Sequence, residues 1–289
     1  MNWLIEPWLH GDWMWRAAAA ITMVSLCTAP VGVVLYLRRE SMLIDALAHT
    51  ALPGIVFAVM LTGRINSVVL LFGAAATGVG AALLIQALAK RPNMRSDAAM
   101  GAVFTTLFAL GVLLLSVRLR GIHLDAEHAL YGNLLAVQNS SIIFLAGWSV
   151  LVWMALVGAR RLISVACFDP KFALAIGAPM TAFQLVMMSA TSLTAVACFE
   201  AVGAVLVVAL VIVPAATAHL LSRTVHAMVG WAVSVSLLSG FAGLYLSIWL
   251  DVSPTGSIVV VLGGLYFVVW MFAPEYGVIA SHHLRTQNT

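Results

Sequence analysis

The stretch SMLIDALAHTALPGIV, residues 41–56, decides the topology of this chain. It is mostly apolar, but it contains Asp45 and His49 four residues apart, followed by Pro53-Gly54. A carboxylate and an imidazole are costly inside a lipid bilayer, and proline and glycine tend to interrupt a helix. Either this stretch lies outside a membrane, or a function requires both side chains within it.

The composition places most of the chain in a membrane. Of its 289 residues, 63% are hydrophobic and 9% are charged, and the mean hydropathy is +1.05, whereas soluble domains carry about 25% charged residues. Low-charge runs of about 20 residues recur, enough to cross the bilayer as helices, and the alternating strands of a barrel are absent. The sequence predicts an all-α polytopic membrane protein with a single transmembrane domain over 1–289. The nine predicted spans are 13–37, 41–62, 66–88, 97–117, 140–159, 179–197, 198–218, 227–249 and 256–273.

Nine spans agree with the distribution of positive charge. Cytoplasmic connections are enriched in Lys and Arg, so we expect the N-terminus outside and the C-terminus in the cytoplasm. Eight spans are possible if 41–62 is re-entrant, but every later connection would then change side and the charge bias would be lost. The cations lie at segment ends and form no patch, so we expect no nucleic-acid partner. The inner cations are Arg38, Arg39, Lys90, Arg91, Arg95, Arg160, Arg161, Lys171, Arg223 and Arg285; the outer ones are Arg16, Arg64, Arg118 and Arg120.

Two connections are long enough to have a structure of their own. The outer one, 118–140, mixes charges, histidines and apolar residues, and we expect it to lie along the membrane surface. The inner one, 160–179, begins with two arginines, contains Asp169-Pro170 and ends near Gly177. Between these breakers there is room for one or two helical turns. Such a helix could dock another protein; a plain linker fits the composition equally well.

Asp45 and His49 are the strongest functional signal inside a predicted span. Residues four apart on a helix differ by about 40° around its axis, so both side chains share a face and can converge on one ion. A carboxylate with an imidazole suits Mn²⁺, Fe²⁺ or Zn²⁺ better than Ca²⁺ or Mg²⁺. A hydrogen bond that neutralises both groups and a proton relay are the other two interpretations. Two ligands leave a coordination shell incomplete, so water or a second chain would have to complete it.

Other polar groups near the spans have open roles. Pro53-Gly54 either breaks its helix, which frees backbone carbonyls beside the pair, or only kinks it. Glu200 lies near the outer boundary between two spans, where it could gate an ion path or cap a turn. His219 lies near an inner span end. Four residues of the outer connection share no helical spacing and are expected to be solvated: His123, Asp125, Glu127 and His128.

Motifs of common enzymes are missing from the sequence. Lys90 follows Ala89 and Lys171 follows Pro170, so neither belongs to a GxxxxGK phosphate loop, and the chain is not its own P-loop ATPase. It contains no HExxH zinc-protease motif and no GxSxG nucleophile elbow. An enzyme is therefore weakly supported by the sequence, and we expect no permanently bound cofactor.

Six blocks, in order over about residues 20–270, share the pattern of one family. They are LIDALAHTALPGI (43–55), SDAAMGAVFTTLFALGVLLLS (96–116), IHLDAEHALYGNLLAV (122–137), FDPKFALAIGAP (168–179), FEAVGAVLVVALVIVPAATAHLLS (199–222) and SGFAGLYLSIWLDVSPTGSIVVV (239–261). Together they resemble the permease subunit of bacterial ABC importers for zinc, manganese or iron. Three positions depart from the usual pattern: Ala48 stands where serine is common, Glu200 where Gln is frequent, and His219 where Arg is frequent.

The resemblance implies a transporter with several partners. Such permeases form dimers of one chain or of two related chains in the bacterial inner membrane. They lie between an extracytoplasmic metal-binding protein and two cytoplasmic ATP-binding subunits. The resemblance places Asp45 and His49 on the translocation path. It also makes the segment from Asp169 to Gly177, with Pro170, Lys171 and Phe172, the coupling segment to the ATPase.

We therefore expect the membrane-spanning subunit of an ATP-driven importer of Mn²⁺, Zn²⁺ or Fe²⁺ that works by alternating access, with ATP hydrolysed by a partner. A proton-coupled secondary carrier, in which Asp45 and His49 relay protons, is the alternative from another transport class. An intramembrane metal-dependent hydrolase would need a nucleophile or a fuller ligand set than the sequence offers.

Overall fold

The computed structural model describes residues 12–62, 67–91, 94–118 and 134–273, and the regular elements in these ranges are helices. Most of the predicted outer connection, with His123, Asp125, Glu127 and His128, lies outside the described residues. The long helices are α2 (Asp12–Leu37), α3 (Leu43–Thr62), α4 (Ser67–Ala89), α5 (Ser96–Arg118), α7 (Asn139–Gly158), α10 (Met180–Val202), α11 (Ala204–Leu221), α12 (Val225–Leu250) and α13 (Pro254–Phe272). The short ones are η2 (Leu134–Ala136), α8 (Arg160–Phe168) and α9 (Pro170–Ala175).

The predicted all-helical membrane fold is confirmed. Eight of the described helices are long and apolar enough to cross a membrane. The remaining long helix is α3, which carries Asp45 and His49 and runs for 20 residues. At 1.5 Å per residue this length is about 30 Å, the thickness of the hydrocarbon layer. Helix α3 is therefore long enough to be a ninth span.

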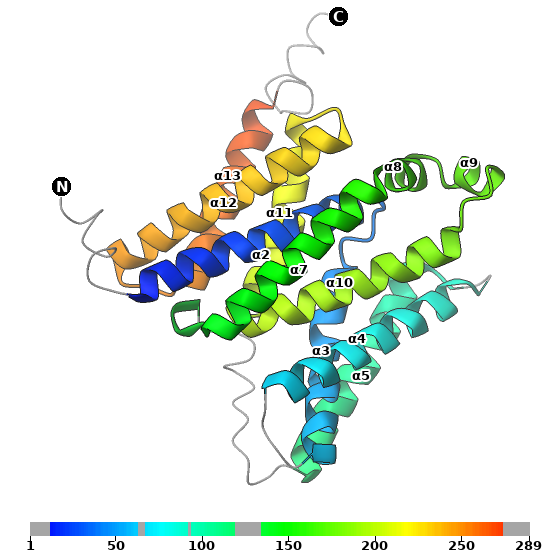
Figure 1. Cartoon of the computed structure of the whole chain (residues 1–289), viewed down its shortest axis with the longest axis horizontal. Coiled ribbons are helices and arrows are strands. Elements are labelled where there is room, and N and C mark those ends of the chain that lie inside the picture. Colours follow the sequence, from blue (N-terminus) through cyan, green and yellow to red (C-terminus); the bar gives the residue numbers. More distant parts are fainter. Residues whose placement is uncertain (1–11, 63–66, 92–93, 119–133, 274–289) are drawn as a thin grey trace, which may run out of the picture.

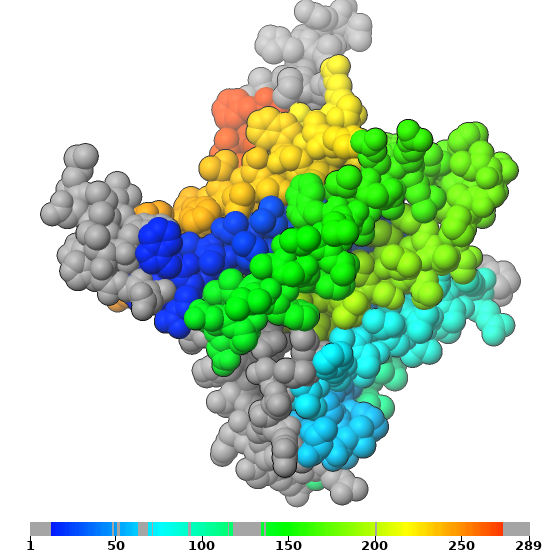
Figure 2. Space-filling model, viewed as in Figure 1, coloured from blue at the N-terminus to red at the C-terminus, as the bar shows by residue number. Residues whose placement is uncertain are grey.

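Helix α2 lies at the centre of the molecule and packs against α7, α10, α11 and α12 (Figure 1). Helices α3, α4 and α5 pack against one another as a separate group. This group meets the rest of the molecule mainly through α10, which contacts both α3 and α4. The space-filling view shows α10 lying between α7 and the group of three (Figure 2). The helix with the polar pair is therefore placed by its own small bundle.

Glycines let these helices approach one another closely. A side chain at Gly32 of α2 would collide with the backbone of Val211 in α11, and one at Gly54 of α3 would collide with the backbone of Gly73 in α4. Because lipid tails are as apolar as the side chains, helix association in a bilayer depends on such close packing. Gly54 therefore serves the contact between α3 and α4.

Proline does not break α3, so of the two alternatives for Pro53-Gly54 the break is excluded. The helix continues through Pro53 to Thr62. Pro53 still has no N–H to donate to the carbonyl of His49, four residues earlier. Gly54, which packs tightly against α4, directly follows the proline.

A neighbouring helix compensates for a proline inside α2. Pro30 lies inside α2 and cannot donate to the carbonyl of Leu26. The indole Nε1 of Trp153 in α7 donates a hydrogen bond to that carbonyl oxygen at 3.1 Å. Backbone groups in a bilayer must find partners within the protein, and here the partner comes from 127 residues away in the sequence.

The boundary between two predicted spans lies five residues later than expected, at 202 instead of 197. Gly203 separates α10 from α11 with a φ of 85°, which glycine adopts far more readily than other residues. Glu200 consequently lies in the last turn of α10, and its side chain lies outside the part that the structure describes.

We predict that Trp153→Phe lowers the free energy of unfolding by about 1 kcal/mol, because the carbonyl of Leu26 loses its donor while the aromatic packing is kept. Pro30→Ala restores the helical N–H to that carbonyl, so Trp153→Phe should cost less in the Pro30→Ala chain. The wild-type chain, the two single variants and the double variant form a double-mutant cycle, and their unfolding in detergent measures the difference. An equal cost in both backgrounds would contradict this role of Trp153.

Candidate functional site

Asp45 and His49 lie on one face of α3, close to its start. The opposite face carries Leu43, Leu47 and Thr50, which are fully buried. The polar side is open by comparison: the Asp45 side chain is 49% exposed and that of His49 is 28% exposed. A carboxylate in the first turn is also favoured by the positive end of the helix dipole. Packing of one face thus fixes the helix and leaves the pair accessible on the other.

The distance between the two groups leaves room for an ion. His49 Nε2 lies 3.7 Å from Asp45 Oδ1, which is longer than a hydrogen bond of about 2.7–3.2 Å. The interpretation in which the pair only neutralises itself through a hydrogen bond is therefore disfavoured. Two metal–ligand bonds of about 2.1 Å span 3.7 Å at an angle of about 120°. At the tetrahedral angle of about 109° the same bonds span about 3.4 Å, so a small movement of either side chain would let both atoms contact one ion.

Two phenylalanines of α5 hold the imidazole in place. The His49 ring centroid lies 5.3 Å from that of Phe104 and 5.6 Å from that of Phe108, the latter edge-on. These contacts restrict rotation of the ring and turn one of its faces toward apolar groups. Sequence reasoning missed both residues, although their spacing of four places them on one face of the predicted 97–117 helix.

The pair alone would make up only part of a metal site. Within the ranges that the structure describes, no three His, Cys, Asp or Glu side chains lie close enough together to hold a metal ion. The carbonyl oxygen of His49, which Pro53 cannot bond, is the nearest backbone acceptor without its usual helical donor. A four- to six-coordinate ion would thus need ligands from water or from another chain.

A cavity of about 870 Å³ lies at the end of the molecule that carries α8 and α9, which we call the α9 end. Met42 and Met100 line it, three residues before Asp45 and four residues before Phe104. The cavity and the pair therefore lie within about two turns of each other along α3 and α5. Cys167 and Pro170 of the 160–179 segment line the same cavity.

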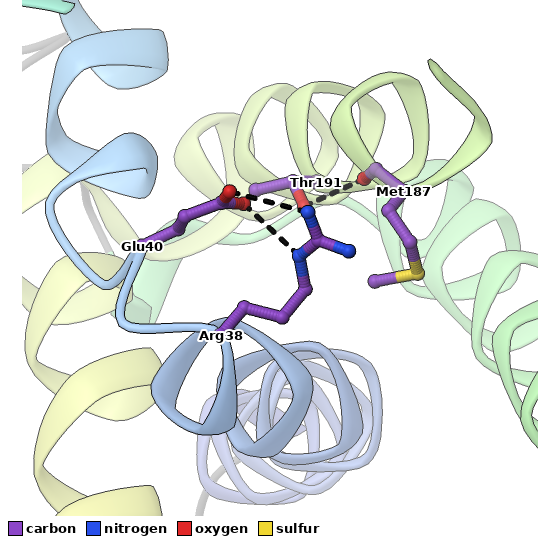
Figure 3. Close-up of polar contacts among 4 residues, drawn as sticks. All are labelled: Arg38, Glu40, Met187 and Thr191. Atoms are coloured by element: carbon purple, nitrogen blue, oxygen red, sulfur yellow. Dashed lines mark hydrogen bonds and ion pairs between the residues drawn. The ribbon is translucent and has the colours of Figure 1, made fainter. Parts of the chain in front are cut away.

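An ion pair closes the turn from α2 into α3 beside this cavity (Figure 3). Arg38 Nη2 and Nε each lie 3.3 Å from an oxygen of Glu40. Both side chains are largely buried, 12% and 17% exposed. The guanidinium also lies over the ring of Phe183 in the first turn of α10, 5.5 Å from its centroid. The start of α3 is thus tied to α10 by charge and by aromatic contact.

His219, in the last turn of α11, also lines the 870 Å³ cavity. Its ring lies 5.1 Å from that of Tyr36 at the end of α2. The structure therefore assigns His219 to the α9 end and does not group it with Asp45 and His49.

The 160–179 segment folds into two helices, of which the sequence indicated only the second. Asp169 caps α9, because its Oδ1 accepts a hydrogen bond from the Phe172 N–H at 2.9 Å, and Pro170 opens the helix. At the other end Gly177 has a φ of 78°. Its N–H and that of Ala178 donate to carbonyls of the last turn, as in a Schellman motif. Asp169 and Gly177 thus bound α9, so of the two alternatives that the sequence left open for this segment, a helix or a plain linker, the structure shows the helix.

Helix α9 and its flanks expose a row of large apolar side chains outside the long helices. Phe168, Phe172, Leu174 and Ile176 are each more than half exposed, and Lys171 lies exposed among them. A short helix that is well capped and yet exposes this much apolar surface is typical of a protein–protein contact.

Comparison with known proteins decides the family. The model of the ABC 3 transport family matches residues 10–273. The chain belongs to this family. The resemblance carried by the six sequence blocks is therefore confirmed.

Known proteins resemble the chain along nearly its whole length. "Manganese transport system membrane protein MntD" of Bacillus subtilis (strain 168) is 40% identical over 286 residues, which is 95% of this chain and 96% of the relative. "Zinc transport system membrane protein TroD" of Treponema pallidum (strain Nichols) is 35% identical over 269 residues, 89% of this chain and 73% of the relative. The solved structure "PsaBC from Streptococcus pneumoniae in complex with Fab" superposes with a TM-score of 0.83 at 25% identity and covers 98% of each chain.

We predict that Cys167, on the cavity wall in α8, is labelled slowly by maleimide at neutral pH. Burial raises the pKa of its thiol to about 11; Arg38 lowers and Glu40 further raises this pKa by smaller amounts. Only the thiolate reacts, so the labelling rate should rise about tenfold per pH unit from pH 7 to 10. Glu40→Gln should speed labelling at a fixed pH. Peptide mass spectrometry locates the label, and a rate that levels off near pH 8.5 would contradict the prediction.

Proposed function

We propose that this chain is the membrane-spanning subunit of an ATP-driven importer of a divalent transition metal ion: Mn²⁺, Zn²⁺ or Fe²⁺. The observation that carries the proposal is the open Asp45–His49 pair on α3, in a chain of the ABC 3 transport family. The manganese and zinc named for MntD and TroD support the class of ion. Mixed oxygen and nitrogen ligands suit the same class.

An incomplete site fits transport better than storage. An ion must bind strongly enough to enter a path and weakly enough to leave it. One chain supplies one carboxylate and one imidazole at 3.7 Å, and a second permease chain, identical or related, would supply a matching pair. Separation of the two chains, or rotation of one α3, would then release the ion by removing half of its ligands.

The α9 end is the cytoplasmic end in this proposal. Arg38, Arg39, Arg160 and Arg161 lie at this end, as expected for cytoplasmic connections, so the N-terminus lies outside and the C-terminus inside. The 870 Å³ cavity then forms the inner part of the ion path. An extracytoplasmic metal-binding protein would deliver the ion at the opposite end.

Helix α9 is the docking element for a cytoplasmic ATP-binding subunit. Its exposed Phe172, Leu174 and Ile176 offer apolar contacts, and its caps keep it helical outside the bilayer. Movement of α8 and α9 would reach α3 through the shared cavity wall and the Arg38–Glu40 turn, which directly precedes α3. ATP binding in the partner could thus alternate access to the pair.

We predict that Asp45→Asn and His49→Gln each lower metal uptake by at least about tenfold, since even the loss of groups around metal ligands costs about 10–100-fold in affinity. Radiotracer uptake of Mn²⁺, Zn²⁺ and Fe²⁺ in metal-limited cells measures this effect and identifies the ion. Asp251→Asn is the matched control, because Asp251 is an exposed carboxylate in the left-handed turn after α12, a conformation that Asn tolerates. Normal uptake by both pair variants at normal membrane levels would refute the ligand role.

Reconstitution separates the importer from a proton-coupled carrier. Uptake into proteoliposomes that contain the chain and its partner subunits should require ATP and should be insensitive to a collapsed proton gradient. Uptake driven by a proton gradient without ATP would favour the carrier, with Asp45 and His49 as the relay.

We predict that Asp169→Ala weakens the partner ATPase interaction, because the first turn of α9 loses its cap at a cost of about 1 kcal/mol. Asp169→Asn should retain most of the interaction, since Asn caps equally well. Co-purification of the ATP-binding subunit and metal-stimulated ATP hydrolysis are the measurements. Equal loss in both variants would assign Asp169 a direct charge contact with the partner instead of a capping role.

A further inference from the structure

A second cavity, of about 330 Å³, lies where α7 ends, α8 begins and α12 begins. Its walls are apolar and come from Trp153, Leu156, Val157, Ile163, Val225 and Val229. Its polar lining residues are Arg160, Ser164 and His226. The space-filling view shows α7 and α8 beside the start of α12 on one face of the molecule (Figure 2). None of the residues named for ion transport above lines this cavity.

Arg160 brings a positive charge to this cavity without a counter-charge. Its side chain is exposed, and no carboxylate of the described residues forms an ion pair with it. The exposed imidazole of His226, from α12, can donate a second hydrogen bond. Ser164 is occupied locally, because its hydroxyl donates to the Arg160 carbonyl at 2.9 Å. The free donors of the cavity are therefore suited to an anion.

The depth of the cavity matches the edge of the bilayer. Arg160 comes two residues after α7, an apolar helix of 20 residues, and His226 is the second residue of α12, an apolar helix of 26 residues. The apolar walls thus lie at the depth of the hydrocarbon, while the cationic rim lies at the depth of the lipid headgroups. Basic pockets between helices at this depth bind acidic headgroups in other membrane proteins.

The walls of the cavity are preformed. The Trp153 ring is held by its hydrogen bond to the Leu26 carbonyl, and Trp153 and Leu156 pack with Val225 and Val229 in one apolar cluster. Ile163 is buried. The volume falls at the lower end of the range of about 300–1,000 Å³ for small-molecule sites. Gly230 leaves open space at its side, so a chain has room to enter between the helices.

We propose that this cavity binds one anionic phospholipid, with the phosphate on Arg160 and His226 and the upper part of an acyl chain against the apolar walls. A soluble anion would leave the apolar walls without a ligand, and a neutral lipid would leave the charge of Arg160 without a partner. The bound lipid would bridge α7, α8 and α12, and so brace the helix that leads into α9. The site is independent of the Asp45–His49 pair and of the metal.

The test measures lipid binding to the full-length chain in detergent. Native mass spectrometry counts retained lipid, and thermal unfolding is followed with dioleoyl phosphatidylglycerol, dioleoyl phosphatidylcholine or inorganic phosphate as the probe. Phosphatidylglycerol should bind and stabilise the wild-type chain. Arg160→Gln and His226→Gln should each weaken its apparent affinity by about tenfold or more. Arg161→Gln is the matched control, because Arg161 is an exposed neighbour that does not line the cavity.

A second variant tests the apolar part of the site. Gly230→Leu fills the open space beside the walls without meeting any atom within 4 Å at its Cβ, and should abolish the response to phosphatidylglycerol while the unfolding temperature without lipid stays unchanged. Gly263→Leu, also in open space, should leave the response intact. Equal affinity in the Arg160→Gln and Arg161→Gln chains would overturn the proposal. Equal stabilisation by phosphatidylcholine, or by phosphate alone, would overturn it as well.

Discussion

Inside the hydrocarbon layer, backbone N–H and C=O groups find no water, and the protein itself must supply every partner. The architecture follows from this constraint. It favours a helix that continues through Pro53, whereas Asp45 and His49 share a face because they lie four residues apart before that proline. It also explains why the Leu26 carbonyl, which Pro30 leaves without a donor, receives one from Trp153 in α7. The need to satisfy the backbone thus explains contacts between helices that lie far apart in the sequence.

Two pairs of ionisable side chains in this chain differ in geometry: one pair stabilises the fold, and the other is accessible to a ligand. Arg38 and Glu40 meet through two contacts of 3.3 Å and are mostly buried, so the pair is closed and holds the turn into α3. Asp45 and His49 stand 3.7 Å apart and are far more exposed, so neither satisfies the other. The first pair fixes the helix on which the second remains available. This difference, and not the presence of charge, makes the Asp45–His49 pair the candidate for binding an ion.

Local features of the sequence predicted much of the fold and site. Apolar runs predicted the spans, a spacing of four placed Asp45 and His49 on one face, and Asp169-Pro170 with Gly177 predicted the ends of α9, because each depends on residues within a few positions. Features that depend on distant segments were missed or left open. The continuity of α3 through Pro53 accompanies the contact of Gly54 with Gly73, and the clamp on His49 comes from Phe104 and Phe108 of another helix. The extent of α10 to Val202 depends on the backbone angle of Gly203.

The arginines at the α9 end have different partners in the structure, although in the sequence each counts only as one positive charge. In the sequence they only orient the chain, and any of them would serve equally. In the structure Arg38 forms an ion pair with Glu40 and lies over the ring of Phe183, so its charge stabilises the turn between α2 and α3. Arg160 has no such partner among the described residues and faces an apolar cavity. A charge that is retained without a protein partner at the edge of a bilayer has lipid as its nearest source of anions. Both arginines flank the route from α9 to the long helices, one on the side of α3 and one on the side of α7 and α12. Helix α9 is our proposed docking site for the ATPase. It is therefore held on one side by the Arg38–Glu40 ion pair and on the other by the lipid that we propose binds Arg160.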